Sequence, residues 1–185
     1  MQTKKPDNLV FLDIETTGLN PFFGAKIVEI AMLKVKGENS ESYEMLVNPK
    51  CPIPLECSRL HFIYDSMVKD CPVFHEIAKD VSDFIGDDIV VCHNAKFDLS
   101  FVSRELKESG ISDKKLSYID TLELARKYFA FDSNALGAIA NAIGVEVKTA
   151  HRAMADVLTM FSVSKYLFEN MHRKGIDEIK PKIYK

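Results

Sequence analysis

The sequence predicts an α/β domain built on a mixed five-stranded sheet that is flanked by helices. Three strand-like segments come first, strand-like and helical segments then alternate, and helical segments alone follow. A length of 185 residues with 46% hydrophobic residues suits one domain with a full core and excludes a disordered chain. We therefore expect a single domain over residues 1–185, with its core at about 9–168.

The predicted strands are short segments rich in apolar and β-branched residues. Turn-forming residues from Gly37 to Ser40 separate the second strand from the third, so these two strands are expected to form a hairpin. The five strands are predicted at residues 9–14, 27–35, 42–47, 88–92 and 117–119.

The predicted helices show apolar residues at helical spacing. In the clearest one, at 73–85, this spacing continues up to Gly86, which is expected to end the helix. Two short helical turns are predicted at 55–60 and 66–69, and longer helices at 97–109, 122–128, 134–143 and 151–168. The tail over 174–185 is basic and polar, and we expect it to be mobile.

The composition limits the cellular location and the binding partners that we expect for this protein. The N-terminal segment does not resemble a signal peptide, and no apolar run approaches the roughly 18 residues that cross a membrane. Four cysteines without disulfide-like spacing indicate reduced thiols and a cytoplasmic protein. The net charge is −3, but if four motif acids bind metal, 23 acidic residues remain against 24 basic ones. Such a balance fits an enzyme that holds one strand end better than one that wraps a duplex.

Acidic residues in three separate clusters carry the chemistry. Asp13 and Glu15 end the first strand, where alternation places both side chains on the same face. Asp98 lies at the junction of a buried strand and a helix, and Asp156 lies in the last helix. A buried carboxylate must be paired, protonated or bound to metal, and paired carboxylates suit a hard divalent cation. Taken singly, the first pair also fits solvent-exposed acids, and Asp98 also fits a helix cap.

His151 lies five residues before Asp156. A regular helix would separate the two side chains by about 140°, at roughly 100° per residue. We therefore expect His151 in the loop or the first turn and Asp156 one turn into the helix. Alone, His151 reads as a surface histidine near a cap. With the four acids it fits two-metal phosphoryl chemistry, in which one metal generates hydroxide from water, the other stabilises the leaving oxygen, and histidine takes a proton.

Three motifs, FLDIETTGLNP, HNAKFDLSF and HRAMADVLTM, give the chain a resemblance to a known family. It resembles the DnaQ-like 3′→5′ exonucleases of the DEDDh group, the family of the proofreading epsilon subunit of bacterial DNA polymerase III, from about Leu9 to Phe168. The resemblance implies an RNase H-like fold. It also implies that two Mg²⁺ or Mn²⁺ ions bind to Asp13, Glu15, Asp98 and Asp156, with His151 as the general base that deprotonates a metal-bound water.

The resemblance also implies a pocket for the 3′-terminal nucleotide, lined by Thr16, Thr17, Leu19, His61, Asn94 and Phe97. One residue departs from the family pattern. The family commonly has His-Gly-Ile where this chain has His61-Phe62-Ile63. If the glycine needs a positive φ, phenylalanine forces a different local path, although Phe62 could instead stack on a base.

These features predict an exonuclease that releases nucleoside 5′-monophosphates from the 3′ end of single-stranded or frayed DNA. An exoribonuclease is the nearest alternative, because the deciding contact to the 2′-hydroxyl is not visible in the sequence. A polymerase-associated proofreading subunit, with a DNA polymerase as partner, is the second. An RNase H-type endonuclease is the third, and the His151–Asp156 motif argues against it. Only about 17 of the 185 residues follow Phe168, which favours a standalone nuclease or an isolated domain.

Overall fold

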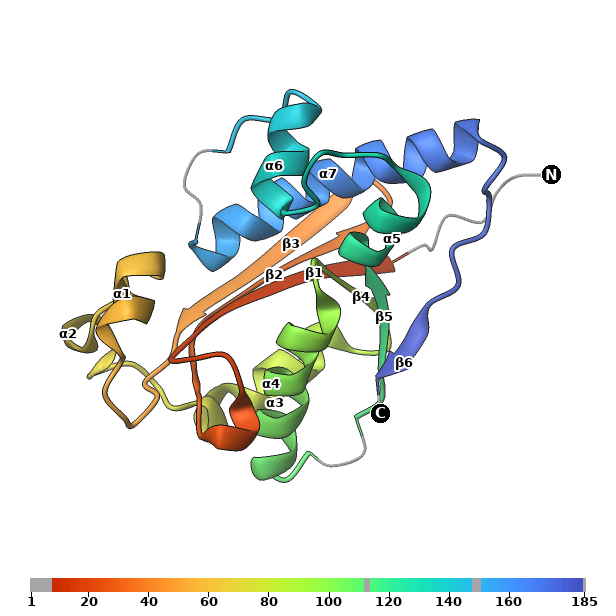
Figure 1. Cartoon of the computed structure of the whole chain (residues 1–185). Helices are drawn as coiled ribbons and strands as arrows, with labels where there is room; N and C mark the ends of the chain where they lie inside the picture. Colours follow the sequence, from red (N-terminus) through yellow and green to blue (C-terminus); the bar gives the residue numbers. More distant parts are fainter. Residues whose placement is uncertain (1–7, 112–113, 148–150, 185) are drawn as a thin grey trace.

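The computed structural model describes residues 8–111, 114–147 and 151–184, and it contains a six-stranded mixed sheet with helices on both faces (Figure 1). The sheet order is β3-β2-β1-β4-β5-β6. Its strands are β1 (Asn8–Thr16), β2 (Ile27–Lys36), β3 (Asn39–Leu46), β4 (Ile89–Cys92), β5 (Leu116–Asp120) and β6 (Lys182–Tyr184). The helices are η1 (Pro21–Phe23), α1 (Leu55–His61), α2 (Asp65–Val68), α3 (Phe74–Ile85), α4 (Ala95–Glu108), α5 (Thr121–Tyr128), α6 (Leu136–Ala142) and α7 (Ala153–Arg173).

Strand β1 lies in the middle of the sheet, and both of its faces are buried where it is apolar. Leu9 and Phe11 face a hydrophobic cluster that includes residues of α7. Val10, Leu12 and Ile14 face the larger cluster, which includes residues of α3 and α4. Burial on both faces explains why this strand reads as a continuous apolar run in the sequence.

The pairing partners of β1 bring the motifs together. Strands β1, β2 and β3 are antiparallel neighbours, and the predicted hairpin between β2 and β3 is confirmed. Strand β1 is parallel to β4, and β4 is parallel to β5. The register between β1 and β2 shifts after Glu15, which pairs with Glu29, because Thr16 pairs with Ile27. Such a bulge re-aims side chains and is common beside active sites.

The fold class is confirmed, but the number of strands differs from the sequence prediction. The sixth strand, β6, comes from the tail that we expected to be mobile, and it pairs antiparallel with β5. Tyr184 of this strand lies against Tyr118, with ring centroids 6.5 Å apart. A three-residue strand inside a polar tail has too little apolar periodicity to be recognised from sequence.

Several helix boundaries also differ from the prediction, and two of the differences have a clear cause. Helix α4 begins at Ala95 rather than at residue 97, because the carboxylate of Asp120 accepts hydrogen bonds from the backbone N–H groups of Asn94 and Ala95. Helix α7 continues to Arg173 rather than residue 168, since the buried Met171 extends its apolar face. Among the helices in the described ranges, none has both the length and the apolar content of a membrane span.

Candidate active site

Two carboxylates project from the end of β1 toward α7. Asp13 and Glu15 lie on the same face as Phe11, as the alternation predicts, and this face packs against α7. Glu15 is buried and Asp13 is half-buried. Neither carboxylate forms an ion pair of its own in the part of the chain that the structure describes.

Asp98 reaches the same region from another element. It lies in the first turn of α4, where it is buried, and its charge acts on Asp13. The backbone of Asn94 just before this helix is left-handed, with φ 76°. Asp120 caps both α4 and α5, because it also accepts hydrogen bonds from the N–H groups of Leu122 and Glu123. The cap fixes the start of α4 and, with it, the position of Asp98.

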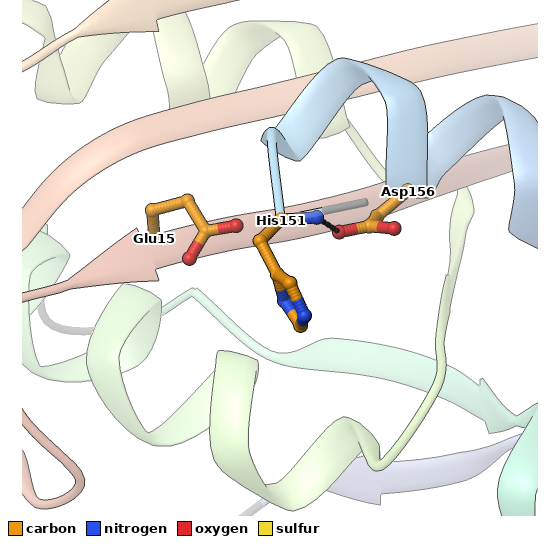
Figure 2. Close-up of side chains that lie close together, drawn as sticks. All are labelled: Glu15, His151 and Asp156. Carbon is orange, nitrogen blue, oxygen red and sulfur yellow. Dashed lines mark hydrogen bonds between the residues drawn. The ribbon is translucent and has the colours of Figure 1, made fainter. Parts of the chain in front are cut away.

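His151 and Asp156 complete the cluster from the start of α7. His151 precedes the helix and Asp156 lies in its first turn, which confirms the arrangement expected from their spacing. The backbone N–H of His151, which has a left-handed φ of 61°, donates to Asp156 Oδ2 at 3.0 Å. Figure 2 shows His151 between the carboxylates of Glu15 and Asp156. One candidate ligand atom from each of these three residues lies within 4.8 Å of the other two.

The carboxylates resist ionisation because of burial. Burial, followed by the charges of Asp156 and Glu29, raises the pKa of Glu15 to about 8, while Arg152 acts in the opposite direction. Burial and a neighbouring Asp98 carboxylate hold the pKa of Asp13 well above its usual range. The same cause raises the pKa of Asp98 and of Asp156.

The clustering, burial and raised pKa values of these carboxylates show whether the residues are suited to bind a divalent metal. Clustered oxygen ligands that lack basic partners and are costly to ionise are the donor set that hard cations such as Mg²⁺ and Mn²⁺ stabilise. Glu15, His151 and Asp156 form the closest group, and the charges of Asp13 and Asp98 act on the same region. The residues therefore fit a metal site.

The predicted nucleotide-binding turn directly follows β1. Thr16 Oγ1 donates to the carbonyl of Gly18 at 2.7 Å, and Thr17 Oγ1 accepts from the N–H of Lys26 at 2.9 Å. Both threonine side chains therefore fix the turn. Leu19 at its tip is 88% exposed. Of the three predicted contact residues in this turn, Leu19 is the exposed one, whereas both threonines are buried.

The segment that departs from the family pattern keeps a left-handed backbone. Phe62 has φ 59° and ψ 23° at the end of α1. Phenylalanine therefore adopts a positive φ itself, contrary to the first of our two expectations, in which it forced a different local path. Its ring is 57% exposed. His61 is buried instead, and its Nδ1 accepts from the N–H of Ile63 at 3.1 Å. Burial lowers the pKa of His61, so it favours the neutral form.

The remaining predicted contacts lie at the start of α4. Asn94 is exposed, and the half-buried Phe97 packs against Phe101, with ring centroids 5.2 Å apart. The histidine of this motif, His93, is hydrogen-bonded to Thr121 Oγ1 and to the carbonyl of Asn134, both at 2.9 Å. Both of its ring nitrogens therefore make structural hydrogen bonds.

Sequence reasoning missed two charged residues that border the site. Glu29 lies fully buried on β2, and Arg152 at the start of α7 forms an ion pair with it at 2.7 Å. The signal for Glu29 was present in the sequence, since it is a lone acid inside the apolar segment IVEIAML.

The fold and this cluster define the class of the protein as a hydrolase of the nuclease type on an RNase H-like fold. The family model described as Exonuclease matches residues 10–163, and the chain belongs to this family. Within the family it is a DnaQ-like exonuclease domain, as the three motifs predicted.

Two relatives illustrate the kinship. The chain is 35% identical over 162 residues to the DNA polymerase III subunit epsilon of Rickettsia conorii. The aligned region covers 83% of this chain and 70% of that protein. It is 34% identical over 173 residues to the PolC-type DNA polymerase III of Bacillus subtilis. This aligned region covers 92% of this chain but only 12% of that protein. The chain thus spans a small part of the PolC-type relatives.

Solved structures support the fold. Exonuclease X in complex with 5′ overhanging duplex DNA matches with a TM-score of 0.68 at 25% identity, over 90% of this chain and 93% of that one. A structure of exonuclease I matches with a TM-score of 0.79 at 18% identity, over 92% of this chain and 42% of that one. The second likeness concerns the fold alone.

Proposed function

We propose that this protein is a 3′→5′ exonuclease that removes nucleotides one at a time from single-stranded or frayed DNA and releases nucleoside 5′-monophosphates. The observation that carries the proposal is the meeting of Glu15, His151 and Asp156 from opposite ends of the chain, beside Asp13 and Asp98. The names of the relatives, DNA polymerase III subunit epsilon and exonuclease X, support the reaction.

Two divalent ions, Mg²⁺ or Mn²⁺, would be held by Asp13, Glu15, Asp98 and Asp156. When bound, they supply activation of water and stabilisation of the charge on the leaving oxygen. The carboxylates prepare this role by staying close together in a buried setting where their own ionisation is unfavourable. Bound cations would favour the ionised carboxylates and offset their negative charge, which would otherwise repel a phosphate.

His151 is the proposed general base. Its side chain is exposed at the mouth of the cluster, while its backbone is fixed through Asp156. An imidazole can accept a proton near neutral pH and pass it to solvent. In the proposed reaction, His151 takes the proton from the water whose oxygen attacks the phosphorus of the terminal phosphodiester. The bond from this phosphorus to the 3′ oxygen of the penultimate nucleotide breaks, and that oxygen takes up a proton from solvent. The released nucleotide therefore keeps the phosphate on its 5′ carbon, and the shortened strand ends in a 3′-hydroxyl.

Exposed apolar side chains beside the site support an unpaired substrate. Leu19, Phe23 and Phe62 lie on the segments that follow β1 and α1, and Phe23 is 90% exposed. Phe22 is held differently, because the guanidinium of Arg104 lies 5.4 Å from its ring centroid. Aromatic side chains stack on bases of any sequence, which suits a nuclease that must accept every 3′ end.

A time course on a 5′-labelled single-stranded DNA oligomer and on its RNA twin, with Mg²⁺ or with EDTA, tests the proposal. We expect a metal-dependent ladder that shortens by one nucleotide at a time, and faster shortening of DNA. Faster shortening of the RNA twin would make this an exoribonuclease, and a single internal cut would contradict exonuclease action. Absence of cleavage in both Mg²⁺ and Mn²⁺ would favour a polymerase-associated subunit.

Three further points stay predictions. A DNA polymerase is a candidate partner through the likeness to epsilon subunits and to PolC-type polymerases. The cytoplasmic location rests on composition. The single-domain organisation, with a core at about 9–168, rests on length and pattern, and limited proteolysis followed by mass spectrometry tests it.

A further inference from the structure

A fully buried carboxylate anchors the start of α7. Glu29 on β2 has no exposed surface. Its Oε1 accepts from Arg152 Nη2 at 2.7 Å and from Nε at 3.1 Å, and its Oε2 accepts from the backbone N–H of Ala153 at 2.9 Å. These contacts join residues 123 and 124 positions apart in the sequence. We call Glu29, Arg152 and Ala153 the anchor.

The anchor differs from a solvent-exposed ion pair because its carboxylate is fully buried. Glu29 lies directly opposite Glu15 in the antiparallel register, and like charges in that position repel. A buried carboxylate is tolerated only when its partners and hydrogen bonds are complete. The planar guanidinium of Arg152 and the first N–H of a helix supply these partners. Glu29 therefore fixes where α7 begins.

The anchor lies between the two residues that α7 brings to the site. His151 is the residue before Arg152, and Asp156 lies one turn after Ala153. Two hydrogen bonds from backbone N–H groups close this turn. The N–H of Asp156 donates to the carbonyl of Arg152, and the N–H of His151 donates to the side-chain carboxylate of Asp156. A shift of the anchor therefore moves both functional residues together.

We propose that Glu29, acting through Arg152 and Ala153, is a positioning residue that sets His151 and Asp156 against the carboxylates of β1. This inference rests on the proposed function. Reacting groups displaced by about 1 Å can cost up to about 10²-fold in rate. The anchor is suited to prevent such a displacement, because it ties α7 to the strand next to the one that carries Asp13 and Glu15.

Two variants separate positioning from stability. Glu29→Gln keeps the shape of the side chain and an acceptor for Ala153, but it removes the charge that holds Arg152. Arg152→Lys keeps the positive charge and removes the planar fork. The matched control is Asp88→Asn, which breaks another low-exposure ion pair on β2, between Lys34 Nζ and Asp88 Oδ2 at 3.1 Å. Asp88 is absent from the proposed site.

Besides the melting temperature, three quantities are measured in each variant, namely the single-turnover rate over a range of single-stranded DNA concentrations, which also gives KM, the Mn²⁺ affinity by calorimetry, and the amide hydrogen exchange of residues 151–157. For Glu29→Gln we expect a rate at least about tenfold lower with little change in KM, weaker Mn²⁺ binding and faster exchange in the first turn of α7. Arg152→Lys should show smaller changes in the same direction. The control should lower the melting temperature and leave all three quantities unchanged.

A Glu29→Gln protein that melts earlier, as the control does, but keeps wild-type exchange at residues 151–157 and wild-type Mn²⁺ affinity would overturn the inference. The exchange and calorimetry measurements need no turnover. If the wild-type protein failed to trim DNA, the proposed function would fail while these two measurements still decided the role of Glu29.

Discussion

The carboxylate of Asp156 accepts a hydrogen bond at 3.0 Å from the backbone N–H of His151, five residues earlier. The bond holds His151 in a left-handed conformation just outside α7, so the imidazole is exposed while its backbone is fixed. Only one oxygen of Asp156 takes part, and the same carboxylate is one of the proposed metal ligands. One side chain would thus organise the histidine and contribute to a metal site.

Replacement of Asp156 should separate these two roles. Asp156→Asn keeps an oxygen that can accept from the N–H of His151 but loses the charge, whereas Asp156→Ala loses both. We expect both variants to bind Mn²⁺ more weakly in calorimetry, and only Asp156→Ala to show faster amide exchange at His151. Equal exchange in the two variants would mean that the hydrogen bond does not hold the loop.

His151→Ala should remove the base without disturbing its surroundings. The backbone N–H that donates to Asp156 remains in the variant, so the metal site should keep its geometry. We expect the single-turnover rate to fall by about 10²-fold or more, with DNA and metal affinities unchanged. Added imidazole should restore part of the rate. Turnover at the wild-type rate would remove His151 from the mechanism.

The metal-free protein should lose stability as the pH rises. Glu15 has its pKa raised from 4.5 to about 8, so the folded state holds a proton that the unfolded state releases in this window. Its contribution to the free energy of unfolding is complete below about pH 4.5 and is lost as the pH rises through about 8. The raised pKa values of Asp13, Asp98 and Asp156 act in the same direction.

Melting temperatures from pH 5 to pH 8.5 in EDTA, with and without added Mg²⁺, test this expectation. Glu15→Gln is the matched variant, because it cannot titrate and should weaken the dependence on pH. The lowered pKa values of His61 and His93 destabilise the protein at low pH instead, and the comparison with the variant cancels them. A difference between wild type and Glu15→Gln that is constant over pH would contradict the raised pKa.

Phe62→Gly should exchange substrate affinity for stability. A non-glycine residue in the left-handed region costs about 1 kcal/mol, and part of this is regained when glycine replaces it. We expect an unchanged or slightly higher melting temperature together with a higher KM for single-stranded DNA, because the exposed ring is lost. Phe62→Ala, which keeps the strain and loses the ring, should raise KM equally. An unchanged KM in both variants would show that the ring does not touch the substrate.

Sequence reasoning recovered the parts of the molecule that depend on local periodicity. The alternation in β1 placed Asp13 and Glu15 on one face, and the spacing of His151 and Asp156 placed the histidine before α7. Both conclusions follow from the geometry of a single strand or helix. The motif resemblance then gave the family.

What could not be predicted depends on contacts between distant segments. The pairing of Glu29 with Arg152 spans 123 positions, and the pairing of β6 with β5 joins the tail to a strand more than 60 residues earlier. Such contacts leave no periodic signal in one sequence. The left-handed conformation of Phe62 is also imposed from outside, because the intrinsic preference of phenylalanine opposes it.

Four residues other than glycine have a positive φ in the described ranges, and three of them, Phe62, Asn94 and His151, lie on motifs of the active site. Each would be relaxed by glycine, so a search for heat-resistant variants should repeatedly find substitutions at these three positions. Under the proposed function, selection for nuclease activity should reject the same substitutions, since Phe62 and Asn94 are proposed to contact the substrate and His151 to act as the base. A gain in melting temperature at these three positions is therefore expected to come with a loss of nuclease activity.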